Sequence, residues 1–540
     1  MTVKNLFTFS LYLLLVITST TKCARKGSPT GGPKDTISPI MVTATPEYEA
    51  INFKSKKIKL QFDEYVKFKD LNKQLIVSPP LKHPSNITPV GTASKKITIE
   101  INDTLKENTT YSFNFGNSIV DNNEGNPLGS FKYVFSTGSY VDSLKIAGIT
   151  KDSYKRESHT NITVLLFEVT ASYTDSIIYN ENPNYITNTL DSTAFDITNI
   201  KEGTYQLVAL KDFNNNYKYD PKEDQISFIE KHINIPTDSF FTLSLFKEIQ
   251  EFSLKRPLEK KVGKIIFGYE GDKKGLDIKL ISDTPEDFKS FLIKEKDKDT
   301  LNFWFTPFEV DSLQFLVKKD TFKKTYTVKL RTKKQDSLTI ESPITNTIHP
   351  KDTFYLESNF PFESVNPENI FITDHDTLAV NFKPIFNSEK SKLYLDFSRV
   401  RNGSYQIDLL PDAFKTFYGK TNDTLQYRLK TLDIEAYGTI ELEVKNPNKK
   451  PVIIELLRGK EDEIVLKRTT SESKKYELKD LKPDTYLVRV IFDDNSNRKW
   501  DTGSFLEKKL PEKVFYYDTK LKLKANWTLD GNVIDIESYN

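Results

Sequence analysis

Apolar residues that alternate with polar ones are the feature that most constrains the fold of this chain. The alternation is clear at Ile58, Leu60 and Phe62, and it returns in further runs: Ile97, Ile99 and Ile101; Tyr111, Phe113 and Phe115; Phe131, Tyr133 and Phe135. A period of two places one face of a segment in a core and the other in water, as in the strands of an antiparallel sheet. Turn-like stretches such as "SPP" and "DNNEGNPLG" separate the runs. Residues 39–138 are therefore predicted to form one β sandwich of immunoglobulin size.

A second domain with the same pattern is predicted at residues 339–431. It contains "KLYLDF", "SYQIDLL" and "TLQYRL", and its "RNGSYQ" corresponds to "ENTTYS" of the first domain. A chain of 540 residues is too long for a single hydrophobic core. Abundant Phe (37) and Tyr (26), with only two Met, suit several thin β layers better than helical bundles.

An internal repeat follows each of these domains. "FDITNIKEGTYQLVALKDFNNNYKYD" starts at Phe195, and "YELKDLKPDTYLVRVIFDDNSNRKWD" starts at Tyr476, and the two align without a gap at an offset of 281. Such a match indicates duplication of a whole unit. The predicted arrangement is all-β, with repeated modules at 139–255 and 432–525, an additional β domain at 256–338 and a C-terminal tail at 526–540.

The N-terminus has the features of a secretory signal peptide. Lys4 precedes the apolar run Leu6–Ile17, which is too short to span a membrane comfortably, and a polar stretch follows. Cys23, the only cysteine of the chain, lies where cleavage is expected, so disulfides are excluded. We predict a signal peptide at 1–22 and a flexible tether at 23–38. The alternative is an ordinary exported protein with an isolated thiol.

The segment "TSTTKCARKG" resembles a bacterial lipoprotein signal, although Lys22 stands where a small residue is usual. With "CARKGSPTGGPKDTISP" and the first sandwich, residues 23–138 resemble a Bacteroidota family of Ig-like-domain lipoproteins, similar to the Ig-like modules of surface-layer proteins. The repeated modules resemble transthyretin-like (carboxypeptidase regulatory-like) β sandwiches. The resemblance implies lipidation at Cys23, tandem Ig-like and transthyretin-like sandwiches, and an outer-membrane lipoprotein with an architectural or binding role.

The compartment would also permit O-glycosylation. Bacteroidota modify envelope proteins at Asp-Ser/Thr followed by a small or aliphatic residue, and ten such positions occur here: Thr36, Thr104, Ser143, Ser176, Ser192, Thr300, Ser312, Ser337, Thr377 and Thr424. Roughly two or three would be expected at ordinary residue usage. The alternative is that Asp-Ser/Thr pairs favour turns at strand ends.

The repeat contains a motif that suggests calcium. D-x-N-x-N-x-x-x-D occurs twice: Asp212, Asn214, Asn216 and Asp220, then Asp493, Asn495, Asn497 and Asp501. With Glu223 at the twelfth position, the first copy resembles a calcium loop of the EF-hand type. Tyr217 and Arg498 replace the usual glycine at position six, and Ser504 replaces the glutamate in copy two. The alternative is a structural turn above two aromatic plugs, Tyr219 and Trp500.

No pattern for catalysis is present. The five histidines are scattered without zinc-binding spacing, and there is no P-loop, dinucleotide fingerprint or nucleophile elbow. Lys+Arg (77) and Asp+Glu (75) nearly cancel, which gives no reason to expect nucleic acid. We expect no enzyme, no small-molecule substrate, and structural Ca²⁺ as the one candidate cofactor.

The leading hypothesis is a structural or protein-interaction subunit of a cell-envelope complex. An outer-membrane β-barrel protein or complex, for assembly or uptake, is the expected partner by analogy. A surface glycan-binding lipoprotein is the alternative, with Trp304, Trp500 and Trp527 as stacking platforms, and a hydrolytic enzyme is the third. Basic residues after Cys23 (Arg25 and Lys26) favour the periplasmic face slightly over the cell surface.

Overall fold

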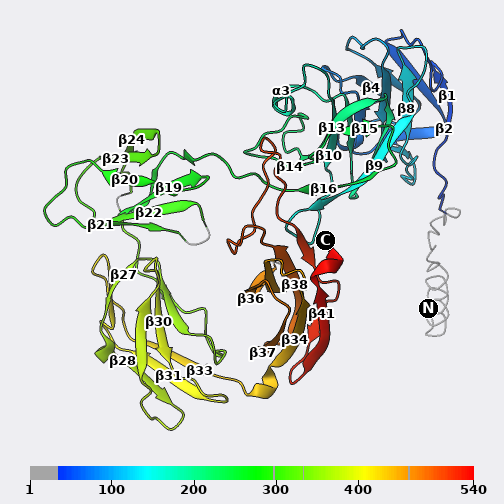
Figure 1. The fold of residues 1–540 in the computed structure, drawn as a ribbon. Helices are drawn as coiled ribbons and strands as arrows, with labels where there is room; N and C mark the ends of the chain where they lie inside the picture. The colour runs from blue at the N-terminus through cyan, green and yellow to red at the C-terminus, as the bar shows by residue number, and fades with distance from the viewer. Residues whose placement is uncertain (1–33, 296–297, 333, 460–461, 540) are drawn as a thin grey trace, which may run out of the picture. The chain divides into compact units, whose positions relative to one another are not determined.

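The fold is that of a computed structural model, which describes residues 34–295, 298–332, 334–459 and 462–539 (Figure 1). The predicted signal peptide, Cys23 and most of the tether lie outside the described residues. Residues 34–38 are exposed and have no regular secondary structure. In the described ranges, no helix combines the length and apolar character needed to cross a membrane.

The first domain is a sandwich of two antiparallel sheets. One has the order β1-β2-β5-β4 with β7 on β2: β1 (Met41–Thr45), β2 (Lys57–Phe68), β4 (Asn86–Thr88), β5 (Ser94–Glu100) and β7 (Ile119–Asp121). The other has the order β3-β6-β8: β3 (Ile76–Ser78), β6 (Thr110–Asn114) and β8 (Lys132–Ser136). Ile58 of β2 lies opposite Ile99 of β5, and both are fully buried. The period of two therefore predicted these strands correctly.

The first repeated module also has two sheets. One has the order β11-β10-β13-β14 with β15 on β13: β10 (Thr163–Glu168), β11 (Tyr185–Asn188), β13 (Gly203–Lys211), β14 (Gln225–Phe228) and β15 (Ile233–Ile235). The other has the order β12-β9-β16, with β16 parallel to β9: β9 (Leu144–Asp152), β12 (Ala194–Ile200) and β16 (Phe240–Leu245). A short helix, α3 (Ile177–Asn180), lies between β10 and β11.

The second repeated module has the same topology. Its sheets have the orders β36-β35-β38-β39, with β40 on β38, and β37-β34-β41, with β41 parallel to β34. Its strands are β34 (Gly438–Lys445), β35 (Val452–Arg458), β36 (Glu463–Thr470), β37 (Lys474–Leu481), β38 (Asp484–Phe492), β39 (Val514–Tyr516), β40 (Leu521–Leu523) and β41 (Thr528–Asp535). The duplication inferred from sequence therefore extends to strand order and direction.

The predicted C-terminal tail at 526–540 is wrong for most of its length. β41 pairs with β34, and the short helix η3 (Ile536–Tyr539) follows it. Ile534 and Ile536 are fully buried in the module's core. The Asp530-Gly531 pair interrupts the alternation of this segment in sequence, which is why its strand was missed.

Two further domains lie between the repeated modules in sequence. The middle one consists of β17 (Ser253–Leu254), β18 (Leu258–Lys261), β19 (Lys264–Glu270), β20 (Asp277–Leu280), β21 (Ser290–Lys294), β22 (Thr300–Phe305), β23 (Ser312–Lys319) and β24 (Phe322–Lys329). The second Ig-like domain consists of β25 (Ile340–Glu341), β26 (Phe354–Ser358), β27 (Phe362–Val365), β28 (Ile370–Asp374), β29 (Phe382–Phe386), β30 (Lys392–Phe397), β31 (Ser404–Leu409), β32 (Phe414–Thr416) and β33 (Leu425–Lys430). The all-β fold class is confirmed throughout the described chain.

Candidate functional site in the paired repeat modules

The first D-x-N-x-N loop leaves the end of β13 as a tight turn. Asp212 Oδ1 accepts the backbone N–H of Asn216 at 3.3 Å, and Oδ2 accepts that of Tyr217 at 2.8 Å. Tyr217 has φ 61°, so a non-glycine residue adopts the left-handed conformation at position six. The carboxylate bonds offset the cost of that conformation.

The second loop repeats this geometry after β38. Asp493 accepts the backbone N–H groups of Asn497 and Arg498, both at 2.9 Å, and Arg498 has φ 65°. Asn497 also accepts the N–H of Lys499 at 2.8 Å, as Asn216 accepts that of Lys218 at 2.9 Å. The leading aspartate and the second asparagine of the motif therefore have the same bonding role in both copies.

A second carboxylate, which lies outside the D-x-N-x-N-x-x-x-D motif, closes each loop. In the first copy, fully buried Asp224 accepts the N–H groups of Phe213 at 3.0 Å and Asp220 at 2.8 Å. In the second copy, Glu512 accepts those of Asp494 at 3.0 Å and Asp501 at 2.9 Å. Both carboxylates thus hold the second and ninth positions of the motif, and both are more deeply buried than the motif's own exposed asparagines.

The register of the strands explains why the second closing residue was hard to find. Val208 pairs with Phe228 in the first module, and Arg489 pairs with Tyr516 in the second. The offset is 281 on the first strand and 288 on the next, so copy two has seven additional residues between them. Asp224 and Glu512 become equivalent only after that insertion is recognised.

The candidate calcium ligands are not all drawn together. Glu223 is exposed, whereas the adjacent Asp224 faces the loop. Burial raises the pKa of Asp212 above its ordinary value, against the lowering effect of its backbone hydrogen bonds. Over the described ranges, there is no group of three or more His, Cys, Asp or Glu side chains placed to hold a metal ion. Calcium binding by carboxylate, amide and carbonyl oxygens and the alternative, a purely structural turn, both stay predictions, and the hydrogen bonds of Asp212 and Asp493 favour the structural turn.

The segment between Asp501 and Glu512, residues 502–511, contains the seven additional residues and is called the insertion; it packs against the first module (Figure 1). Phe505 is fully buried, and its ring meets that of Phe228 on β14 edge-on, with 5.1 Å between ring centroids. Gly503 passes so close to Phe246 that a Cβ atom would lie 2.7 Å from its ring. The insertion is therefore an apolar plug for the first module.

Polar contacts hold the same insertion in place. Glu248 accepts the hydroxyl of Tyr219 at 2.7 Å and also the backbone N–H of Phe505. Thr502 donates its hydroxyl to Lys247 O at 2.7 Å. Tyr219, the plug predicted beneath the first loop, is buried as expected, and through Glu248 it connects that loop to the insertion of the second. Burial and the bond to Glu248 raise the Tyr219 pKa well above its ordinary value.

A second contact between the modules is aromatic and ionic. Arg489 and Glu455 form an almost completely buried ion pair, with Nη2 and Oε2 2.7 Å apart. The ring of Tyr154, from the first module, covers the guanidinium of Arg489, with 4.0 Å between the guanidinium carbon and the ring centroid. The backbone carbonyl of Tyr154 accepts a hydrogen bond from the hydroxyl of Tyr516 at 3.0 Å. Trp500 is half-buried and contacts Tyr154 with ring centroids 4.8 Å apart, so it joins the two modules in addition to bordering its own turn.

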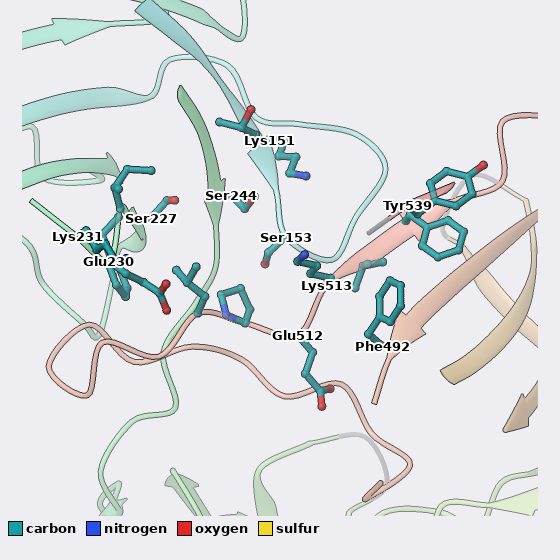
Figure 2. Close-up of a pocket in the computed structure, with 17 residues that line it drawn as sticks. Lys151, Ser153, Ser227, Glu230, Lys231, Ser244, Phe492, Glu512, Lys513 and Tyr539 are labelled. Carbon is teal, nitrogen blue, oxygen red and sulfur yellow. The ribbon is translucent and has the colours of Figure 1, made fainter. Parts of the chain in front are cut away.

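A cavity of about 720 Å³ lies between the docked modules (Figure 2). The first module contributes mainly hydroxyl groups and charges, and the second contributes apolar and aromatic side chains. Its lining residues include Lys151, Ser153, Ser227, Phe228, Lys231 and Ser244 of the first module, and Phe492, Glu512, Lys513, Val514, Phe515 and Tyr539 of the second. This volume is in the range of pockets that bind small molecules, about 300–1,000 Å³.

The remaining predicted positions lie apart from this cavity. Eight of the ten candidate glycosylation residues are exposed, and Thr300 and Ser312 are half-buried at the first positions of β22 and β23. Trp304 is 7% exposed and is unavailable as a stacking platform, whereas Trp527 is 52% exposed with Lys524 above its ring. Cys23 lies outside the described residues.

Comparison with known proteins assigns the first domain. A family model described as a bacterial Ig-like domain matches residues 35–137. A search of curated proteins found no match. The family match assigns residues 35–137 to a bacterial Ig-like domain, and stacked β sheets continue through the rest of the described chain. Tandem β sandwiches with an Ig-like domain are typical of structural or binding proteins.

Solved structures with Ig-like repeats are also similar at low identity. Surface layer protein SbsC, domains 1–6, is 11% identical, with 90% of this chain and 68% of that chain covered and a TM-score of 0.17. A Bacteroides ovatus surface protein, SGBP-B of a mixed-linkage glucan utilization locus, solved with a mixed-linkage heptasaccharide, is 12% identical, with coverages of 68% and 92% and a TM-score of 0.18. The I9–I11 tandem of titin is 11% identical, with coverages of 53% and 100% and a TM-score of 0.12.

Proposed function

We propose that this chain is a non-enzymatic, lipid-anchored outer-membrane protein that acts as a structural or protein-interaction subunit of a cell-envelope complex. The observation that carries the proposal is the docking of the two repeat modules through the insertion around Phe505. The insertion of the second module contacts the first module through both apolar and polar groups. This use of a loop to bind another β sandwich supports a role in protein interaction. Nothing in that arrangement requires a reacting group.

The anchor in this proposal is the acylated Cys23, followed by the tether to the first Ig-like domain. The partner is an outer-membrane β-barrel protein or complex, to which strand edges and loops of the modules offer docking surfaces. Structural Ca²⁺ at the twin loops and O-glycans at the exposed Asp-Ser/Thr positions are compatible additions, and neither is required for docking.

A surface glycan-binding role is the second candidate, and one observation favours it. The ring of Trp527 is 52% exposed, and an exposed indole face can stack on a sugar ring. Trp304 is buried and Trp500 is engaged with Tyr154, so a platform of several tryptophans is not formed in the described chain. A single exposed indole supports glycan binding less well than the docked modules support protein interaction.

The test is affinity purification of the tagged chain from native membranes solubilised in mild detergent, with a Cys23→Ser variant as control. The proposal predicts that the wild-type chain is in the outer-membrane fraction and recovers a barrel protein at near-equal stoichiometry. The variant should leave the membrane fraction and recover less of that protein. Recovery of the wild-type chain alone would contradict the interaction role, and membrane retention of the variant would contradict the anchor.

A further inference from the structure

The cavity between the repeat modules is bordered by a strand edge of the first module. The N–H of Ile229 donates to Leu207 O at 3.2 Å, so residues 227 and 229 direct their backbone groups toward β13. Ile226 and Phe228 therefore direct their backbone groups away from β13. Ile226 is bridged to Phe246 after β16, but in the described chain no further bridge joins β14 to β16. The two strands diverge there, and Phe228 and Ser244 line the opening.

The equivalent strand of the second module also borders the cavity. Phe492 donates its N–H to Lys513 O at 2.9 Å, and Tyr517 donates to Val488 O at 2.9 Å, so residues 513, 515 and 517 face β38. Val514 consequently points its N–H and C=O away from β38, toward the edge of the sheet. Val514 is the equivalent of Ile226, yet no bridge corresponding to Ile226–Phe246 is formed at Val514 in the described residues. The edge of β39 can therefore accept another strand.

The walls of the cavity suit one apolar side chain. Phe515 stacks on Tyr539 with centroids 3.8 Å apart and contacts Phe492 at 5.9 Å, which gives a continuous aromatic wall. Opposite it, Ser153 is 7% exposed, and its buried hydroxyl has no hydrogen-bond partner within the described residues. Figure 2 shows Ser153 between Ser244 and Lys513. A buried hydroxyl without a partner is costly unless a ligand group completes its bonding.

The charges at the cavity favour an acidic ligand. Lys151, Lys231 and Lys513 line it and are all exposed. Of the two carboxylates, Glu512 is engaged by the N–H groups of Asp494 and Asp501, which leaves exposed Glu230 as the available anion. Three exposed lysines and one exposed carboxylate among the lining residues give the rim a positive field.

We propose that this cavity binds an extended segment of a partner protein, in which an apolar side chain is flanked by acidic residues, and that the segment pairs with β39 at Val514. The apolar side chain enters between the aromatic wall and Ser153, the acidic neighbours meet the three lysines, and backbone hydrogen bonds form along the free edge. This inference rests on the proposed function and deepens it, because it locates the partner's binding site at the junction of the duplicated modules.

The test uses the full-length lipidated chain and two variants in the membrane purification described above. Val514→Pro removes the outward N–H donor without removing a bond to β38, a change that an edge strand tolerates. The triple variant Lys151→Gln, Lys231→Gln and Lys513→Gln removes the positive rim. Its matched control has the same charge change on exposed residues of β24, as Lys323→Gln, Lys324→Gln and Lys329→Gln. Thermal unfolding of each variant checks that the fold is kept.

We expect each cavity variant to recover about tenfold less partner than wild type, whereas the β24 control recovers the wild-type amount. If wild type recovers a partner and both well-folded cavity variants recover the same amount of it as wild type, the cavity is not the binding site, and the proposed function stands. If wild type recovers no protein, the proposed function fails and this inference fails with it. If the lysine control loses as much partner as the lysine cavity variant, general charge rather than this site directs binding, which overturns the inference.

Discussion

Asp224 and Glu512 have the same structural role in the two copies of the loop. The loops are 281 residues apart in the sequence, whereas these two carboxylates are 288 residues apart. Each carboxylate accepts the backbone N–H groups of the second and ninth positions of its loop. Between Asp501 and Glu512 the second module has seven more residues than the first has between Asp220 and Asp224, and this longer segment places Phe505 on the first module. The closing carboxylate therefore has the same role in both copies, although the segment before it differs in length and in what it contacts.

The first prediction concerns the plug. Phe505→Ala should destabilise the docked pair of modules by about 3 kcal/mol, because a fully buried ring is replaced by a cavity. The measurement is denaturant unfolding of the full chain, together with the rate of limited proteolysis within residues 502–511. Leu506→Ala is the matched control, since Leu506 is 61% exposed and should change stability by less than about 0.5 kcal/mol. Equal effects of the two substitutions would argue against the docking described here.

The second prediction separates the two neighbouring acids of the first loop. Asp224→Ala leaves the N–H groups of Phe213 and Asp220 without their acceptor and should cost about 2 kcal/mol or more. Glu223→Ala removes an exposed side chain and should change stability by less than about 0.5 kcal/mol in the absence of calcium. Chemical denaturation in a chelating buffer measures both. A larger loss for Glu223→Ala would reverse the roles assigned to these residues.

The third prediction concerns calcium. Because backbone N–H groups already satisfy Asp212 and Asp493, we expect the twin loops to keep their structure in a chelator, with the same unfolding midpoint as in millimolar Ca²⁺. Calorimetry in the two buffers measures this directly. A midpoint that rises with Ca²⁺ in wild type, and rises less in Asp212→Asn with Asp493→Asn, would instead establish the loops as calcium sites.

The fourth prediction is a pH dependence in the first Ig-like domain. Burial would raise the pKa of Asp121, but four backbone N–H donors, from Asn123 to Asn126, outweigh it and hold the pKa below its ordinary value. The stabilisation is present above the unfolded-state pKa of about 3.9 and is lost as the pH falls through the depressed folded-state pKa.

Asp121→Asn should therefore be less stable than wild type at pH 7, and the difference should narrow as the pH falls below about 4. Equilibrium unfolding between pH 2 and pH 7, followed by a probe in the first domain, measures this. Glu124→Gln, at an exposed position of the same loop, should show no comparable narrowing. If the difference in unfolding free energy between Asp121→Asn and wild type instead grew on acidification, the proposed role of the Asp121 carboxylate would be contradicted.

Much of the fold could be predicted because its strands alternate regularly. Ile58, Tyr111 and Leu393 all lie in the buried faces that the period of two predicts. The 281-residue offset correctly identifies β13 and β38 as equivalent strands of the two repeated modules. The last strand was missed because Asp530 and Gly531 interrupt its pattern, and its parallel partner, β34, lies almost ninety residues earlier. Non-local pairing leaves no signal in a local window.

The site could be predicted only in part, for a related reason. The D-x-N-x-N motif is local, so both turns were found. Glu512 and Phe505 lie beyond the gapless part of the repeat, so the alignment gives them no counterpart in the first copy. The contact of Tyr154 with Arg489 joins residues far apart in the chain, which no local pattern predicts. The sequence signal for this contact is the difference in length between the two copies, which lies within residues 502–511 of the second copy.

The most direct measurement of the central claim is site-specific photo-crosslinking in living cells, with the crosslinking residue at position 513 beside the free edge of β39. We predict one protein adduct when the crosslinking residue replaces Lys513, and none when it replaces the exposed Lys323 of β24. We further predict that the adduct disappears when Val514→Pro is added. No adduct at position 513, or equal adducts at both positions, would contradict the claim that the paired repeat modules bind a partner protein at their junction.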